Sequence, residues 1–337
     1  MNPIRFISEK INQKPKDKYN ILTFSTHEAY QETMAKTGHN FYLLEPKGGK
    51  TWNDNFRKLP SNCKIIKDTK KIPYDIDILL SQERYGQLQY MVSLANSTRI
   101  PLIHIDHVEP IKDENFQTLL KFKADQHVFI TDHNKQSWGV DGQVIKHGID
   151  TELFSGWKHN NSKKVVYTVN YLQDRDFFCG WREWSYIKAK VAKIDPEIEF
   201  ILIGDNPGIS QPISDKNELV NKLKSCACYI NTSKFSPVPM SLLEAMSCGM
   251  PIVSTRYQQV AQLLDHKNAV SSNNPDMLAD AVVNICNNNE LFADMGTAAR
   301  QHILNEFSVE SFIKNWNDLF TKIYNQRLSN PHEVLYI

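Results

Sequence analysis

The chain alternates between short apolar runs and longer amphipathic segments, with polar turns between them. In the first half, runs of about four or five apolar residues predict strands, and the segments between them have helical spacing. We expect strands at residues 21–24, 40–44, 64–66, 76–80, 101–105, 128–131 and 143–146, and helices at about residues 28–36, 85–95 and 115–122. Apolar strands that alternate with helices are typical of a parallel sheet covered on both faces.

The second half restarts this pattern after a polar stretch at residues 156–163. Strands are expected at residues 165–169, 200–203, 226–230 and 252–254, and helices at 185–192, 217–224, 242–246, 260–264, 275–286, 290–306 and 309–324. A length of 337 residues suits two domains. The sequence therefore predicts an α/β protein with two Rossmann-like, doubly wound domains, residues 1–155 and 156–308, followed by a helical segment at 309–337.

Composition narrows the class of protein. No run approaches the ~20 apolar residues of a membrane span, so we expect no integral membrane association. The six cysteines have no metal-ligand spacing, which favours reduced thiols, a cytoplasmic location and no bound metal. The formal charge is only +1, but residues 46–71 carry eight Lys and Arg against two Asp. This basic segment is either a solvated face or a patch for an anionic acceptor.

The segment from residue 232 to residue 255 has the pattern of a ligand-binding loop and helix. Two prolines hold an extended loop, Ser241 is an expected N-cap with Glu244 in capping-box spacing, and Gly249 is expected to end the helix. The unpaired first-turn N–H groups would attract an anion, and Glu244 could accept two ribose hydroxyls. A helix that only caps itself is the alternative interpretation.

This segment resembles the C-terminal signature of retaining GT-B glycosyltransferases of the GT4-like class. Ser236 stands where that family has a first Glu, which contacts the donor sugar. The resemblance implies two domains facing a central cleft, a nucleotide-sugar donor, no cofactor, and a last helix that packs back towards the N-terminal domain. The residues that match are Leu243-Glu244-Ala245-Met246, Gly249, Pro251-Ile252-Val253 and, where the family crosses between domains, His147-Gly148-Ile149-Asp150 with Phe154.

The resemblance also implies roles for individual residues. Glu244 is expected on the ribose, and Arg175, with Arg182 as second choice, on the diphosphate, because a guanidinium forms paired bonds to phosphate oxygens. His107, just past a strand, is expected to face the reactive sugar, whereas His104 in mid-strand is expected in the core. The other expected contacts are Asn170, Gly204, Ile213, Pro239, Met240, Ser241 and Leu242 for the nucleotide, and Ser236 and Val238 for the donor sugar.

His27, Lys50 and Arg57 are the expected acceptor contacts. The Asn- and Lys-rich composition and the basic segment favour a phage enzyme in the host cytoplasm. Such an enzyme would move a hexose or pentose from a UDP-sugar to 5-hydroxymethylcytosine in double-stranded DNA, and would have to flip the base out of the stack. The alternatives are a glycosyltransferase of surface polysaccharide or lipid-linked glycan, a degenerate nucleotide-binding protein and a sugar epimerase. Gly48-Gly49-Lys50-Thr51 lacks the first glycine of a phosphate-binding P-loop, because Leu44 occupies that position.

Overall fold

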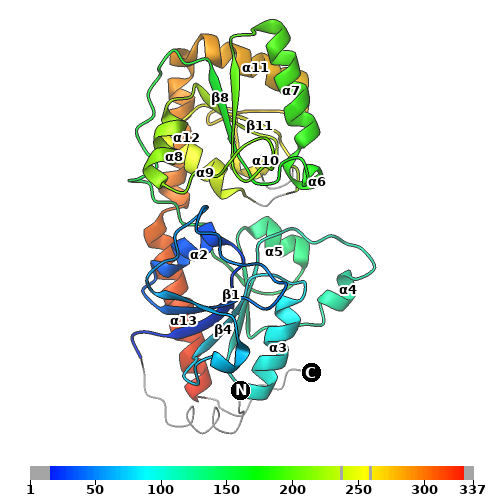
Figure 1. The fold of residues 1–337 in the computed structure, drawn as a ribbon, viewed down its shortest axis with the longest axis vertical. Coiled ribbons are helices and arrows are strands. Elements are labelled where there is room, and N and C mark those ends of the chain that lie inside the picture. The colour runs from blue at the N-terminus through cyan, green and yellow to red at the C-terminus, as the bar shows by residue number, and fades with distance from the viewer. Residues whose placement is uncertain (1–15, 236–237, 258–259, 330–337) are drawn as a thin grey trace. The chain divides into compact units, whose positions relative to one another are not determined.

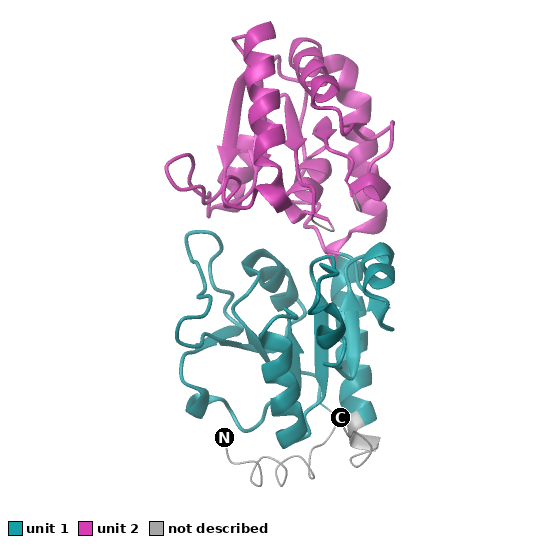
Figure 2. Ribbon diagram, turned by 90° about the vertical axis from the view of Figure 1, so that its right-hand side faces the viewer, with its two compact units in different colours: residues 1–146, 310–337 teal, residues 147–309 magenta. Residues whose placement is uncertain are grey.

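A computed structural model describes residues 16–235, 238–257 and 260–329. The chain forms two compact units, which we call unit 1 (residues 1–146 and 310–337) and unit 2 (residues 147–309), coloured teal and magenta in Figure 2. Residues 147–155, which we placed in the first domain from the sequence, group with unit 2. There the Ile149 N–H donates to the Phe307 carbonyl at 2.8 Å, and Ser247 Oγ donates to the Phe154 carbonyl at 2.8 Å.

Unit 1 is built on a seven-stranded sheet in the order β3-β2-β1-β4-β5-β6-β7, and every pair of neighbouring strands is parallel (Figure 1). The central strands β1, β4 and β5 are buried along their whole length, which is why β1 and β4 are mostly apolar, whereas β5 also buries His104 and Asp106. The strands are β1 (Asn20–Phe24), β2 (Asn40–Leu44), β3 (Cys63–Ile66), β4 (Ile78–Ser81), β5 (Leu102–Asp106), β6 (Gln126–Phe129) and β7 (Gln143–Val144). The helices are α2 (Glu28–Ala35), α3 (Gln87–Thr98), α4 (Phe116–Leu119), α5 (Asp132–Trp138) and α13 (Val309–Ser329), with a short 3-10 turn at Thr69–Lys71.

Helix α13 packs against the rest of unit 1 through a stripe of aromatic side chains. Phe312 lies edge-on to Tyr30, with ring centroids 5.4 Å apart, and Phe320 lies 5.3 Å from the ring of His39. Trp316, between them on the same face, is fully buried. This spacing of apolar side chains at every fourth residue is the stripe that the sequence shows. None of the described helices is both long and apolar enough to cross a membrane.

Unit 2 is built on a five-stranded parallel sheet in the order β12-β11-β10-β8-β9. Its core is formed by the buried residues of β8, β10 and β11 together with the apolar faces of α7, α9 and α11. The strands are β8 (Lys164–Thr168), β9 (Glu199–Ile203), β10 (Cys228–Asn231), β11 (Ile252–Ser254) and β12 (Val270–Ser271). The helices are α6 (Asp176–Cys179), α7 (Trp181–Ile194), α8 (Lys216–Lys224), α9 (Met240–Cys248), α10 (Val260–Leu263), α11 (Pro275–Asn287) and α12 (Ala293–Glu306), with a 3-10 turn at Asn289–Phe292.

The α/β fold expected from the sequence is confirmed, and each expected strand is present with ends shifted by only a few residues. The expectation of a strand up to Thr131 is wrong, because β6 ends at Phe129 and Thr131 caps helix α5 by accepting the N–H of Asn134. The sequence analysis missed α5 because the helix is polar and buries only Asn134 and Trp138. Helix α6 and strand β12, of four and two residues, were also missed.

Candidate functional site

The carboxyl edge of the unit 2 sheet contains a switch point between β8 and β10. The chain passes from β8 to β9 on one side and then to β10 on the other, so the loops that follow β8 and β10 diverge there (Figure 1). Ligands of open α/β sheets bind in this kind of crevice. The hydroxyl of Tyr229, on β10, lies 3.0 Å from Ser241 Oγ on α9 and 3.4 Å from the carbonyl oxygen of Thr168 at the end of β8. These contacts attach the first turn of α9 to the switch point.

Helix α9 begins two residues earlier than its sequence pattern indicates. Its N-cap is Pro239, and Ser241 lies inside the first turn with its hydroxyl bonded to Tyr229, so the expected capping box of Ser241 and Glu244 is wrong. The N–H groups of Leu242 and Leu243 reach the Pro239 carbonyl, at 3.1 and 3.3 Å. Among the described residues, no acceptor meets the N–H groups of Met240 and Ser241. This end of α9 is therefore suited to bind an anion.

Glu244 lies in the second turn of α9 and is buried, with 7% of its surface exposed. Its charge is felt by Cys248, one turn further along the helix. Burial raises the pKa of the Cys248 thiol to about 12, and the Glu244 carboxylate adds to that increase. Gly249 ends the helix in the left-handed conformation, as expected from the sequence. The helix thus holds a buried carboxylate close to its own positive end.

The two candidate phosphate-binding arginines differ in their surroundings. Arg175 is exposed at the start of α6, and its guanidinium lies 5.6 Å from the centroid of the Phe178 ring. Arg182 already pairs with Asp176 at 3.2 Å, and 85% of its side chain is exposed. Arg175 belongs to the loop that leads from β8 at the switch point, and its role on the diphosphate stays a prediction.

A glycine allows α7 to begin directly against the end of β10. Gly180 has a φ of +74°, and a Cβ atom at this position would lie 2.1 Å from the carbonyl oxygen of Thr232. Thr232 Oγ1 in turn donates to the Cys179 carbonyl at 2.9 Å. The turn between α6 and α7 is therefore packed onto the backbone that leads to α9, which keeps the Arg175 loop beside the helix.

The remaining expected donor contacts have mixed surroundings. Asn170 Oδ1 accepts the Asp205 N–H at 2.9 Å and so ties the loop after β8 to the loop after β9. Gly204, at the end of β9, lies against this tie, and a Cβ atom there would be 2.1 Å from the Val169 carbonyl oxygen. Val238 and Leu242 are buried in the core of unit 2, and Ile213 and Pro239 are partly buried. Ser236 lies outside the described residues.

His147 was not assigned a role from the sequence, although it begins a segment that carries the resemblance. Its imidazole is buried and makes a hydrogen bond to the backbone of Val238. Burial lowers the pKa of His147 to about 4, and the bond to Val238 opposes the change only in part. A neutral imidazole therefore supports the backbone that enters α9.

In unit 1, the structure brings two predicted site residues together. The rings of His27, after β1, and His107, after β5, lie 4.3 Å apart, and the ring of Tyr30 meets His107 edge-on at 4.6 Å. The ammonium of Lys50 pairs with Glu28 at 2.8 Å while half of its side chain stays exposed. Arg57 is a correction: its side chain is 4% exposed and its Nε pairs with Glu32 at 3.4 Å, so it presents no surface to an acceptor.

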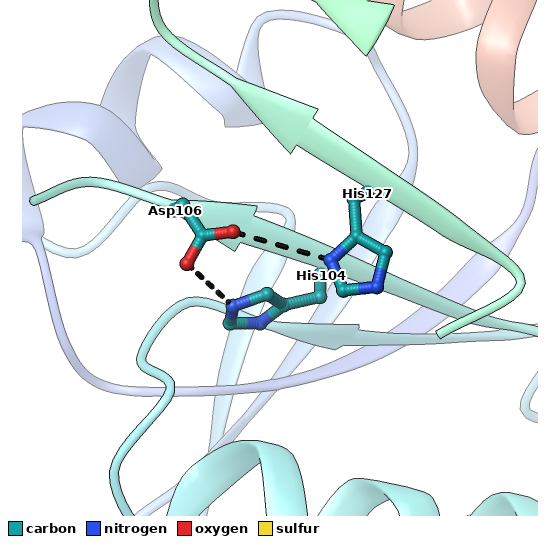
Figure 3. A group of neighbouring side chains, drawn as sticks. All are labelled: His104, Asp106 and His127. Atoms are coloured by element: carbon teal, nitrogen blue, oxygen red, sulfur yellow. Dashed lines mark hydrogen bonds and ion pairs between the residues drawn. The ribbon is translucent and has the colours of Figure 1, made fainter. Parts of the chain in front are cut away.

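Three buried side chains of β5 and β6, shown in Figure 3, form a cluster with the spacing of metal ligands: His104, Asp106 and His127. His104 Nε2 lies 3.1 Å from Asp106 Oδ1, and His127 Nδ1 lies 4.0 Å from Asp106 Oδ2. A fourth side chain, Arg84, binds both oxygens of this carboxylate, at 2.9 and 2.6 Å. The guanidinium carbon of Arg84 also lies 4.2 Å from the centroid of the Trp138 ring.

This cluster is a buried ion pair between Arg84 and Asp106, with the imidazoles of His104 and His127 beside the carboxylate. Burial raises the pKa of Asp106, but His104 and Arg84 outweigh it and hold that pKa at about 2. Burial lowers the pKa of His127 to about 3, so this imidazole is neutral near pH 7. Both carboxylate oxygens are already bound to the guanidinium of Arg84. A cation would have to displace this bidentate pair, so the donor set does not favour a metal.

Comparisons with known proteins agree with this fold. Residues 178–302, most of unit 2, match the family described as Glycosyl transferases group 1. The chain is 24% identical over 293 residues to the poly(ribitol-phosphate) alpha-N-acetylglucosaminyltransferase of Staphylococcus aureus, covering 76% of this chain and 57% of that protein. It is 20% identical over 305 residues to the N-acetyl-alpha-D-glucosaminyl L-malate synthase of Bacillus anthracis, covering 77% of this chain and 74% of that protein.

A similar solved structure is that of Anabaena HepE in complex with UDP and glucose, with a TM-score of 0.70 at 13% identity, covering 90% of this chain and 99% of that one. This chain spans little more than half the length of the S. aureus protein, 57%. At such identities the structural likeness establishes the fold. The protein therefore has the GT-B fold of glycosyltransferases, and residues 178–302 match the glycosyl transferases group 1 family.

Proposed function

We propose that this protein is a retaining, metal-independent glycosyltransferase that moves a sugar from a UDP-linked donor to a hydroxyl group of an acceptor. The observation that carries the proposal is the arrangement at the unit 2 switch point, where Tyr229 joins the first turn of α9 to the end of β8 and Arg175 lies in the loop that follows β8. Positive potential organised in advance stabilises the charge that develops on a leaving diphosphate. In this proposal Glu244 binds the ribose, Ser236 and Val238 contact the donor sugar, and His107 acts from unit 1.

Two similarities support the donor class. The matched family segment, residues 178–302, contains α9 with Glu244 and ends within α12. The HepE structure holds UDP and glucose, and the name of the S. aureus protein describes transfer of N-acetylglucosamine. A UDP-hexose is therefore the first donor to test.

The acceptor has two candidates. The basic segment at residues 46–71 agrees with an anionic acceptor, and 5-hydroxymethylcytosine in phage DNA is one such acceptor. The names of the two related proteins include poly(ribitol-phosphate) and L-malate, which are also anionic and carry hydroxyl groups. These names favour a polyol phosphate or another small hydroxyl compound over DNA.

The test measures UDP affinity by calorimetry, and UDP release from a panel of UDP-hexoses and UDP-pentoses, for the natural protein and for Glu244→Ala. Loss of the hydrogen bonds that a carboxylate makes to ribose should weaken UDP binding by about 10- to 100-fold. The matched control is Glu290→Ala, at an exposed position of the 3-10 turn before α12. Unchanged UDP affinity in Glu244→Ala would exclude the ribose role.

The same assay, run with duplex DNA containing 5-hydroxymethylcytosine, with ribitol-phosphate oligomers and with no acceptor, separates the alternatives. Release that requires one acceptor identifies that acceptor class. UDP binding without release from any donor supports a protein that only binds nucleotide. Conversion of the sugar in the absence of any acceptor supports an epimerase.

A further inference from the structure

Unit 1 contains a pocket of about 360 Å³ at the carboxyl edge of its sheet, a volume within the range of ligand sites. The chain runs from β1 through β2 to β3 on one side and then to β4 on the other, so the switch point of this sheet lies between β1 and β4 (Figure 1). The pocket is lined by residues that follow β1, β2, β3 and β4. It therefore occupies the place where an open α/β sheet binds ligands.

Part of the pocket lining is aromatic. The ring of Tyr90, on α3, meets the ring of Phe24 edge-on with centroids 5.7 Å apart, and Tyr85 contributes a third ring. Tyr85 and Tyr90 keep 43% and 40% of their surface exposed, so two rings are open to a ligand. These rings offer apolar faces that suit C–H groups or another ring.

The lining also carries hydrogen-bond donors and acceptors, which are already linked to one another. Gln87 Nε2 donates to Thr26 Oγ1 at 2.6 Å and to Glu83 Oε2 at 3.2 Å. Lys50 donates to Glu28 at 2.8 Å and to the Thr26 carbonyl, and its charge acts on Glu83. Burial raises the pKa of Glu83 and Lys50 lowers it, so this carboxyl is partly removed from water. The pocket thus contains an acceptor, Glu83, and a donor, Lys50, in the same lining as the aromatic rings.

The segment that carries Glu83 and Tyr85 is anchored from within the protein. Arg84 lies between them in the chain, and its side chain is the buried partner of Asp106. Both charged side chains are 1% exposed. Because Arg84 is held by two hydrogen bonds, its neighbours on either side enter the pocket from a rigid backbone.

These groups discriminate between classes of ligand. A phosphate would meet the like charge of the Glu83 carboxylate in the pocket lining. A fatty chain would take the charged groups of Glu83 and Lys50 further from water without adding hydrogen bonds to them, which is unfavourable for polar groups. A hydroxyl donates to a carboxylate and accepts from an ammonium, and the C–H faces of a sugar or polyol pack on aromatic rings.

We propose that this pocket binds a sugar or polyol unit of the acceptor, with Glu83, Gln87 and Lys50 on its hydroxyls and Tyr85 and Tyr90 on its C–H face. The inference rests on the proposed glycosyltransferase function, since it names the acceptor chemistry for that reaction. Lys67, an exposed residue of the pocket lining, is the group that would meet an anionic part of the acceptor.

The experiment measures direct binding by saturation-transfer NMR on the full chain, in the absence of donor. The probes are ribitol, methyl α-glucoside, inorganic phosphate and 5-hydroxymethyl-2′-deoxycytidine. Ribitol or methyl α-glucoside should bind, and both Tyr90→Ala and Glu83→Ala should weaken that binding by about tenfold or more. Tyr74→Ala is the matched control, because Tyr74 is a partly exposed tyrosine of unit 1 outside the pocket lining.

UDP affinity is measured on the same samples. The UDP affinity should be the same in every pocket variant as in the natural protein. This measurement tests the donor site separately from the pocket. If the natural protein does not bind UDP, the proposed function is contradicted and not the inference about the pocket. Absence of binding by both polyhydroxyl probes, with UDP binding intact, would overturn the inference. Binding of phosphate or of the modified nucleoside that is lost in Tyr90→Ala would also overturn it and assign the pocket to that ligand.

Discussion

Replacing Asp106 with Ala should destabilise unit 1 by about 3–5 kcal/mol, because the change leaves the buried guanidinium of Arg84 without its counter-charge. The structure sets this size. Arg84 and Asp106 are each 1% exposed and share two hydrogen bonds of 2.9 and 2.6 Å, so water cannot replace the lost carboxylate. An exposed pair is the matched comparison: Lys314 and Asp318 on α13, whose side chains are 74% and 63% exposed, should contribute only about 0.3–0.5 kcal/mol.

The pH dependence of this contribution follows from the lowered pKa of Asp106. The folded value of about 2 lies below the ordinary value of 3.8. The stabilisation is therefore fully present above pH 3.8 and is lost as the pH falls through about 2. Between pH 5 and 8 the difference between Asp106→Ala and the natural protein should accordingly stay constant.

Native-state hydrogen exchange read by mass spectrometry is the suitable assay, because a chain of two units need not unfold in one step. For peptides from β4, β5 and β6, the free energy of the opening that allows exchange should fall by about 3–5 kcal/mol. For peptides from β8 to β11 this free energy should not change. The double variant Arg84→Met with Asp106→Leu should recover most of the loss, because no charge is then left buried. A cost below about 1 kcal/mol for Asp106→Ala, or no recovery in the double variant, would refute the reasoning.

Further predictions concern both units. Arg175→Ala should weaken UDP binding by about tenfold or more, with Arg175→Lys intermediate and Arg182→Ala much milder, in the calorimetric assay. The pKa of His127 is lowered from 6.5 to about 3, so below pH 6.5 the folded state binds fewer protons than the unfolded state. The urea midpoint of unfolding should therefore fall as the pH drops from 6.5 towards 3. His127→Gln should remove up to about 1.4 kcal/mol per pH unit of this dependence. Zinc should leave the melting temperature unchanged, and a rise that requires His127 would contradict the ion-pair interpretation. Gly180→Ala should lower the melting temperature of unit 2 by forcing a Cβ atom against Thr232, at a cost of about 2 kcal/mol or more.

Local sequence rules accounted for the order and type of most elements. The strands β1 and β4 are mostly apolar because they are covered on both faces, and Gly249 ends α9 because a residue with positive φ is needed there. The same rules misplaced the start of α9. They identified Ser241 as the cap, but Ser241 Oγ accepts a hydrogen bond from the hydroxyl of Tyr229 on strand β10. Sequence spacing cannot reveal this contact.

The sequence by itself determined that the protein has two α/β domains and that Glu244 lies just inside a helix after a strand, because hydrophobic periodicity and turn residues act over a few positions. Only the tertiary structure decided which loops meet. Strand order places β4 between β1 and β5, and this brings Gln87 to Thr26 and Arg84 to Asp106. In unit 2, burial of the imidazole brings His147 to Val238. These residues are far apart in the chain, and their contacts arise from sheet pairing and burial, which no local pattern encodes.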